Sequence, residues 1–211
     1  MVDTKNLLDQ WDADLSTAQH NNLDAQLARR RFLHTASKAS AAALMLPTMT
    51  LFSACQQTQT GPDKQLKQEP WLSFARVQLI LFPNDGDGPS ASDLNATAYL
   101  NFVLTADDTD PEERDFIYQG ISWLDQLAHT NHQTRFIKTS PAQQAQLITD
   151  ISKSKSGERW LSYLLLYLFE ALLSDPAYGG NPNGIGWNWL DHQPGFPRPD
   201  KTKIYPQLLK R

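Results

Sequence analysis

The sequence contains a single cysteine, Cys55, among 211 residues. It therefore cannot form an internal disulfide. It also cannot build a thiolate zinc site or an iron–sulfur cluster by itself, because these sites need several cysteines. No Gly-x-Gly-x-x-Gly motif follows a strand-like segment, so we expect no FAD or NAD held by this chain. No Ser/His/Asp arrangement of recognisable form is present, and we predict no catalytic residues.

Excess positive charge and long apolar runs are also missing. Nineteen Lys and Arg residues stand against 23 Asp and Glu, which gives a net charge of −4 and no basic stripe for nucleic acid. The weakly apolar residues 36–52 include Lys38 and Pro47, and they fall short of the roughly 20 apolar residues that a membrane-spanning helix needs. No alternating apolar run is long enough to indicate a sheet.

An arginine cluster precedes this weakly apolar stretch. In the segment Arg29-Arg30-Arg31-Phe32-Leu33, the residues Arg29, Arg30, Phe32 and Leu33 fall in a pattern that resembles a twin-arginine (Tat) export signal. That pathway moves proteins that are already folded, and it hints at a cofactor-bearing cargo. A hydrophobic helix of the mature fold is the alternative. The 28 polar residues before Arg29 are rich in Asn, Asp and Gln, and they predict a disordered leading region.

The lone cysteine lies at the end of this signal. Leu51–Cys55 resembles a bacterial lipobox in its Ser-Ala-Cys ending, although Phe52 departs from the usual leucine. We therefore predict lipidation of Cys55; the alternative is an incidental residue discarded with the signal. This gives three parts: a signal over residues 1–54, a flexible tether over 55–68, and a single domain over 69–211. The predicted location is periplasmic, with the membrane reached through the lipid anchor.

The domain reads as all-α, a small bundle of about five helices with an irregular Gly/Pro/Trp-rich tail from residue 174. The expected helices are Pro70–Leu81, a helix capped by Ser90 or Ser92 and ending near Leu104, one opened by Pro111-Glu112-Glu113, one from Ser140-Pro141 through Ile151, and Glu158–Leu173. The segment Asn84–Pro89 predicts a turn. The last of these helices is apolar nearly all round, and we interpret it as buried within the bundle rather than spanning a membrane.

The tail combines turn residues with aromatic ones. It contains Asp175-Pro176-Ala177-Tyr178-Gly179-Gly180-Asn181, then Gly186-Trp187, then Pro194-Gly195. Glycines permit close backbone approach, and tryptophans supply large rigid contact areas. Such a segment either wraps its own domain or presents a surface to a partner, and the residues alone leave both open.

These motifs resemble the gluconate 2-dehydrogenase subunit 3 family, the small subunits of membrane-associated FAD-dependent sugar and sugar-acid dehydrogenases. The resemblance covers roughly Trp71–Gly195 and includes the Leu81-Phe82-Pro83 segment, the acidic turn Asp85–Pro89 and the tail. The sequence departs from the family pattern at Leu190–Gln193. The resemblance implies that the tail contacts the large subunit, through Tyr178, Gly179, Gly180, Asn181, Trp187, Pro194 and Gly195.

The resemblance also implies a division of labour. A large flavoprotein subunit would hold FAD and oxidise the sugar, and a multihaem cytochrome c subunit would take the electrons through haem c. The small subunit would be non-catalytic and would bring the signal for the Tat translocase, carrying the flavoprotein out with it.

Other functions compete with this hypothesis. A stand-alone periplasmic lipoprotein that binds a ligand or protein without redox chemistry is the main alternative, and a small enzyme using Asp191 and His192 is a weaker one. His129 and His132 are spaced to share a metal, but no acidic residue follows in register, so we predict no metal site. Asn84–Gly88 is better explained as a solvated turn than as a calcium loop.

Overall fold

The computed structural model describes residues 4–14, 65–200 and 202–204. Its helices are α3 (Trp71–Leu81), α4 (Ala96–Thr105), α5 (Pro111–His132), η1 (Phe136–Lys138), α6 (Pro141–Ile151), α7 (Lys155–Leu173), η2 (Pro176–Tyr178), η3 (Pro182–Gly184) and α8 (Ile185–Trp189). These described residues contain no strand, which confirms the all-α prediction. The five longest of these helices are the five expected ones; α8 and a helix over residues 4–14 add to them.

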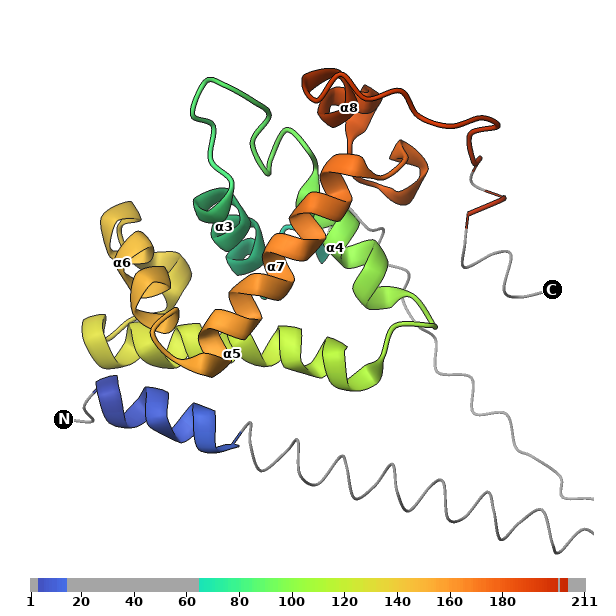
Figure 1. The fold of residues 1–211 in the computed structure, drawn as a ribbon. Coiled ribbons are helices and arrows are strands. Elements are labelled where there is room, and N and C mark those ends of the chain that lie inside the picture. Colours follow the sequence, from blue (N-terminus) through green and yellow to red (C-terminus); the bar gives the residue numbers. More distant parts are fainter. Residues whose placement is uncertain (1–3, 15–64, 201, 205–211) are drawn as a thin grey trace, which may run out of the picture.

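The bundle is built on the crossing of its two longest helices. Figure 1 shows α7 running diagonally across α5, with α3 and α6 to one side and α4 close to the upper half of α7. Gly120 of α5 faces Trp160 of α7 so closely that a Cβ there would lie 2.1 Å from the indole ring. The Trp160 indole Nε1 donates to the carbonyl of Ile117 at 2.9 Å. The missing side chain at Gly120 therefore lets the fully buried Trp160 side chain fill the crossing.

Local signals in the sequence predicted several helix ends correctly. Asp110 accepts the Glu112 N–H at the start of α5, with Pro111 in the first helical position. At α6, Ser140 and Gln143 form a reciprocal capping box, and the helix runs from Pro141 to Ile151 as expected. In each case the side chain that satisfies the first free N–H groups lies immediately before the helix, so the end is a local property.

Two helix starts differ from the prediction. Neither Ser90 nor Ser92 caps α4, because the Asp93 carboxylate accepts hydrogen bonds from the Ser90 N–H and hydroxyl and closes a separate turn. Asn95 then takes a left-handed conformation with φ 53°, and α4 begins only after it. The helix expected from Glu158 begins earlier, at Lys155, because Ser154 accepts the Gly157 N–H.

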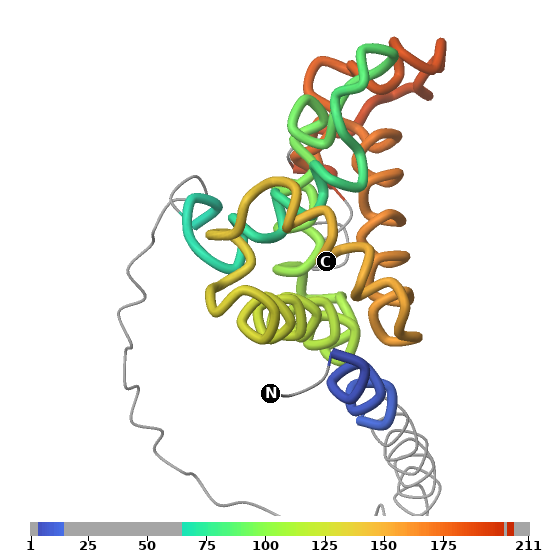
Figure 2. Tube along the Cα trace, turned by 90° about the vertical axis from the view of Figure 1, so that its left-hand side faces the viewer, coloured from blue at the N-terminus to red at the C-terminus, as the bar shows by residue number. Residues whose placement is uncertain are grey.

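Part of the polar leading region is helical. Residues 4–14 form a helix that lies against the domain beside α5, shown in blue in Figures 1 and 2. Leu7 and Trp11 are buried in its contact with the domain. The prediction of disorder was wrong for residues 4–14, because Leu7 and Trp11 bury apolar surface against the domain.

Several predictions fall on residues outside the described ranges. These are the export motif Arg29, Arg30, Phe32 and Leu33, the lipidation site Cys55, and residues 55–64 of the tether. Within the ranges given above, no helix combines the length and the apolar character required to cross a membrane.

Candidate partner-binding surface

The tail after α7 folds back over one end of the bundle. Asp175 accepts the Ala177 N–H and starts η2, and Gly179 ends it with φ 96°. Two long-range hydrogen bonds fix the tail to the start of α4: Asn95 Nδ2 donates to the Gly179 carbonyl, and the Asn181 N–H donates to the Leu94 carbonyl, both at 2.9 Å. The tail is therefore an integral part of the domain.

Asn181 is the central polar residue of this tail. Its side chain is fully buried and it adopts a left-handed conformation with φ 50°. The side-chain Nδ2 donates to the Ser174 carbonyl at 3.0 Å, and Oδ1 accepts the Gly186 N–H at 2.7 Å. One amide thus joins the end of α7 to the start of α8 and leaves neither backbone group unpaired in the interior.

Two glycines allow the tail to approach α7 closely. A Cβ at Gly186 would lie 2.3 Å from the Leu172 carbonyl oxygen, and one at Gly180 would lie 3.0 Å from the Ala171 carbonyl oxygen. Both contacts are with backbone atoms, which cannot swing aside. The glycines therefore serve packing within the domain.

Trp187 completes the end of α7. Its side chain is 6% exposed, and its indole Nε1 donates to the Leu173 carbonyl at 2.7 Å. The guanidinium of Arg198 lies 4.9 Å above the ring, and the same Arg198 pairs with Asp175 at 2.9 Å. Because α7 has no basic side chain in its last turn, Trp187 and Asn181 supply the donors for its terminal carbonyls.

Trp189 connects the tail to a distant part of the sequence. Its indole Nε1 donates to the Asp87 carbonyl at 2.9 Å, and its ring lies edge-on to Phe82 with centroids 6.3 Å apart. Gly88 packs directly against the ring, where a Cβ would lie 2.5 Å from it. The Leu-Phe-Pro segment with its acidic turn and the Gly-Trp tail are therefore brought together at one end of the molecule.

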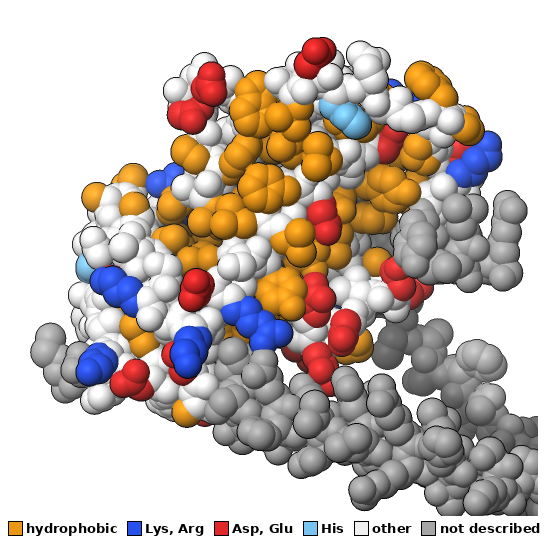
Figure 3. All heavy atoms as spheres, in the orientation of Figure 1, with side chains coloured by type: hydrophobic (Ala, Val, Ile, Leu, Met, Phe, Trp, Pro, Cys, Tyr) orange, Lys and Arg blue, Asp and Glu red, His pale blue; other side chains and the backbone are white. Residues whose placement is uncertain are grey.

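An apolar surface lies beside this end. Leu166, Phe169 and Leu173 are 49%, 50% and 50% exposed, and their spacing of three and four residues places them on one side of α7. We call these three residues the α7 face. Figure 3 shows hydrophobic side chains gathered along α7 and continuing toward α8, where Trp189 and Leu190 are also exposed. The prediction that this helix is buried within the bundle holds for its other side, where Trp160, Leu164 and Leu168 are buried, but not for the α7 face.

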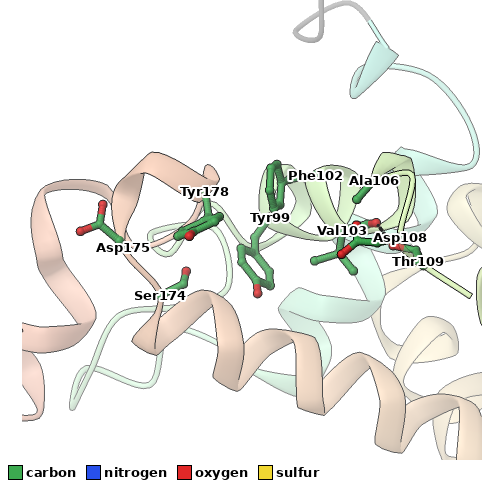
Figure 4. A pocket seen from close by; sticks show the side chains of 9 residues that line it. All are labelled: Tyr99, Phe102, Val103, Ala106, Asp108, Thr109, Ser174, Asp175 and Tyr178. Atoms are coloured by element: carbon green, nitrogen blue, oxygen red, sulfur yellow. Dashed lines mark hydrogen bonds between the residues drawn. The ribbon is translucent and has the colours of Figure 1, made fainter. Parts of the chain in front are cut away.

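A hollow of about 320 Å³ lies between α4 with the residues after it and the start of the tail. Figure 4 shows Tyr99 and Phe102 of α4 beside Ser174 and Tyr178 of the tail, and all four line the hollow. Phe102 and Tyr178 meet edge to face, with ring centroids 5.5 Å apart. The buried Ser174 hydroxyl makes no hydrogen bond with the described part of the chain. The hollow is thus mainly aromatic and apolar, with a few polar groups at its edge.

Two tyrosine–glutamate pairs border α7. Tyr99 donates its hydroxyl proton to Glu170 at 3.0 Å, and Tyr167 donates to Glu113. Burial, together with the neighbouring carboxylate, raises the pKa of both tyrosine hydroxyls well above the ordinary value. Both hydroxyls therefore hold their protons more tightly than a free tyrosine and act as donors to Glu170 and Glu113.

The described residues contain no group of three or more His, Cys, Asp or Glu side chains that could hold a metal ion. His132 Nδ1 lies 3.3 Å from the side-chain amide nitrogen of Gln143.

Asp191 and His192, the pair considered for a small enzyme, are exposed, and the His192 N–H donates to the Trp187 carbonyl. In the turn, the side chains of Asn84 and Asp85 each accept a backbone N–H two residues on.

Comparison with known proteins adds the family. The sequence matches the family described as Gluconate 2-dehydrogenase subunit 3 over residues 68–195, more than half of the chain. The chain belongs to this family. No curated protein and no solved structure gives a match. The family match runs from just before α3 to just after α8, and so contains the α7 face and both motif segments but not residues 4–14.

For this member of the gluconate 2-dehydrogenase subunit 3 family, the predicted partner-binding residues fall into two groups. Gly180, Asn181 and Trp187 are buried, whereas Tyr178 and Gly179 are partly exposed beside the hollow. Pro194 is partly exposed and Gly195 exposed, beyond α8. Their contact with a partner stays a prediction.

Sequence reasoning missed Leu166, Phe169 and Leu173. The composition of this helix could have revealed them. The helix is apolar on every side, and the four other long helices of one small domain cannot bury all of its surface.

Proposed function

We propose that this chain is the non-catalytic small subunit of a periplasmic FAD-dependent sugar or sugar-acid dehydrogenase complex. In this role it supplies the Tat export signal and assists maturation and export of the flavoprotein subunit. Family membership supports a place in a gluconate 2-dehydrogenase-like complex. A multihaem cytochrome c is the proposed electron acceptor, and a lipid on Cys55 is the proposed membrane anchor.

The α7 face is the observation that carries the proposal of a large partner. Three half-exposed apolar side chains in register on one helix, next to exposed Trp189 and Leu190, are typical of a surface that another protein covers. The hollow between α4 and the tail offers a pocket into which a partner's apolar side chain fits. We therefore place the flavoprotein contact along α7 and the adjoining edge of the tail.

Co-purification of the flavoprotein tests this placement. We expect the double change Leu166→Glu and Phe169→Glu to weaken binding by roughly thirtyfold or more, because loss of one interface hot spot costs about 2 kcal/mol. The matched control is Leu72→Glu, which charges an exposed leucine on α3, a helix that lies behind α7 (Figure 2). Melting temperatures should stay close to the wild-type value in both. Normal recovery of the flavoprotein with the double variant contradicts the placement.

The hollow also supports a second candidate function, a stand-alone periplasmic lipoprotein that binds a small ligand. About 320 Å³ lined by Tyr99, Phe102 and Tyr178 is within the size range of ligand pockets. Under this alternative no flavoprotein co-purifies with the wild-type chain, and a ligand is recovered from the purified protein. Changing Phe102 to Trp, which fills the hollow, would then abolish ligand recovery.

A further inference from the structure

The helix over residues 4–14 makes specific contacts with α5. The ring of Trp11 stacks on Trp123, with centroids 5.6 Å apart and planes 24° apart, and Trp11 is only 2% exposed. Its indole Nε1 lies 3.4 Å from Gln126 Oε1, and the Thr4 hydroxyl lies 3.0 Å from Asn131 Oδ1. The apolar face and the polar edge of this short helix both have partners on the domain.

The same helix contacts the start of α7. The Asp12 carboxylate accepts the N–H groups of Lys155 and Ser156 at 3.1 and 2.8 Å, and the Ser156 hydroxyl at 2.7 Å. Ser154 already caps α7 from within the domain. Asp12 therefore satisfies donors that water would otherwise satisfy, and the domain can keep α7 intact when residues 4–14 leave.

The predicted export motif lies between the docked helix and the domain in the sequence. The docked helix precedes Arg29–Leu33 in the sequence, and α3 of the folded domain follows it. In export by an N-terminal signal, the domain crosses the membrane while the chain ahead of the arginine pair stays on the cytoplasmic face. A domain that still holds residues 4–14 would have to carry them across as well, so crossing requires their release.

We propose that residues 4–14 are a retention latch, which holds the folded domain back from translocation until this helix undocks from α5 and α7. The proposal rests on the proposed function, because it takes Arg29 and Arg30 as the export motif. A latch of this kind delays export of the free small subunit and gives the flavoprotein time to bind. The helix lies outside residues 68–195, the region that matches the family.

Export kinetics of the full chain, produced together with its flavoprotein, test the latch. Trp11→Ala and Asp12→Ala should each shorten the half-time for appearance in the periplasm severalfold. The matched control is Gln10→Ala on the exposed side of the same helix, which should export at the wild-type rate. Trp123→Leu removes the stacking partner without altering the leading segment and should act like Trp11→Ala, provided that its melting temperature shows a folded domain.

The possible outcomes distinguish a failure of the latch hypothesis from a failure of the proposed function. Hydrogen exchange on the purified full chain verifies that residues 4–14 lose protection in Trp11→Ala. If they do, and the export half-time is unchanged or longer, the latch is refuted. If Arg29→Lys with Arg30→Lys leaves export unaffected, the export motif itself is refuted, whatever the Trp11 variants do.

Discussion

Asn181 shows how one side chain determines the course of the tail. Replacing it with Ala removes the partners of the Ser174 carbonyl and the Gly186 N–H in a buried position. We expect a loss of about 2–6 kcal/mol in the free energy of unfolding, since each of the two buried groups left unpaired costs about 1–3 kcal/mol. Asn183→Ala is a matched control, because Asn183 is also left-handed, with φ 56°, but exposed. Thermal or urea unfolding of both variants gives the comparison, and equal losses would contradict the role assigned to Asn181.

Asp12 makes the docking of residues 4–14 dependent on pH. Burial raises the pKa of its carboxyl, but the hydrogen bonds from Ser156 and Lys155 outweigh this effect, and the net pKa lies below the ordinary 3.8. A lowered pKa means that the ionised form stabilises docking; this contribution is complete above pH 3.8 and is lost as pH falls through the folded-state value.

The near-ultraviolet circular dichroism of the Trp11–Trp123 pair reports on this docking. Acidification should weaken the signal in the wild type before the far-ultraviolet signal of the bundle is lost. In Asp12→Asn the acid-dependent step should disappear, because no carboxyl titrates there. A wild-type pair signal that follows global unfolding at every pH would show that Asp12 contributes nothing to docking.

At the scale of elements, the contact between the end of α7 and α8 determines whether the tail stabilises the domain or binds a partner. Trp187 is buried and donates to the last turn of α7, so Trp187→Ala should lower the free energy of unfolding by about 3–5 kcal/mol. Trp189→Ala, at a 41% exposed position, should cost less. Chemical denaturation of the isolated domain measures both. An unchanged midpoint for Trp187→Ala, together with loss of flavoprotein binding, would instead make Trp187 a direct interface residue.

The elements also show which features the sequence could predict. The starts of α5 and α6 were predictable because Asp110 and Ser140 cap the next residues along the chain. The α7 face was not predictable from periodicity, because apolar residues surround α7 and only the placement of α4 and α5 decides which side stays open. The docked helix was missed for a related reason. Leu7, Leu8 and Trp11 are at helical spacing, but Trp123, the ring on which Trp11 stacks, is far away in the sequence.

The composition of the tail left open whether this segment wraps its own domain or meets a partner. In the structure Trp189 contacts the Asp87–Gly88 turn and Asn181 contacts the start of α4, so the tail packs on its own domain. Contact of the tail residues with a partner stays a prediction. The sequence could not separate glycines that permit close packing from glycines that face a partner. That distinction depends on which backbone atoms lie next to each glycine Cα, and these neighbours are known only from the folded structure.

At the scale of the whole molecule, the features fall at two ends. The motif segments, the hollow and the exposed Trp189 and Leu190 gather where α7 ends and α8 begins, whereas residues 4–14 hold the opposite region, where α7 starts against α5 (Figure 1). In the proposed account the first end and the α7 face bind the flavoprotein, and the second end restrains export. Because the two regions are separate, flavoprotein binding and undocking can be altered independently by the variants described above.

The most direct test of the central claim is the location of the flavoprotein in cells that make it together with this chain. With the wild-type chain, fractionation should find the flavoprotein and its FAD in the periplasm. With Arg29→Lys and Arg30→Lys, both proteins should accumulate in the cytoplasm as a complex that still co-purifies. A flavoprotein that reaches the periplasm equally well with the double variant, or in the absence of this chain, would contradict the account.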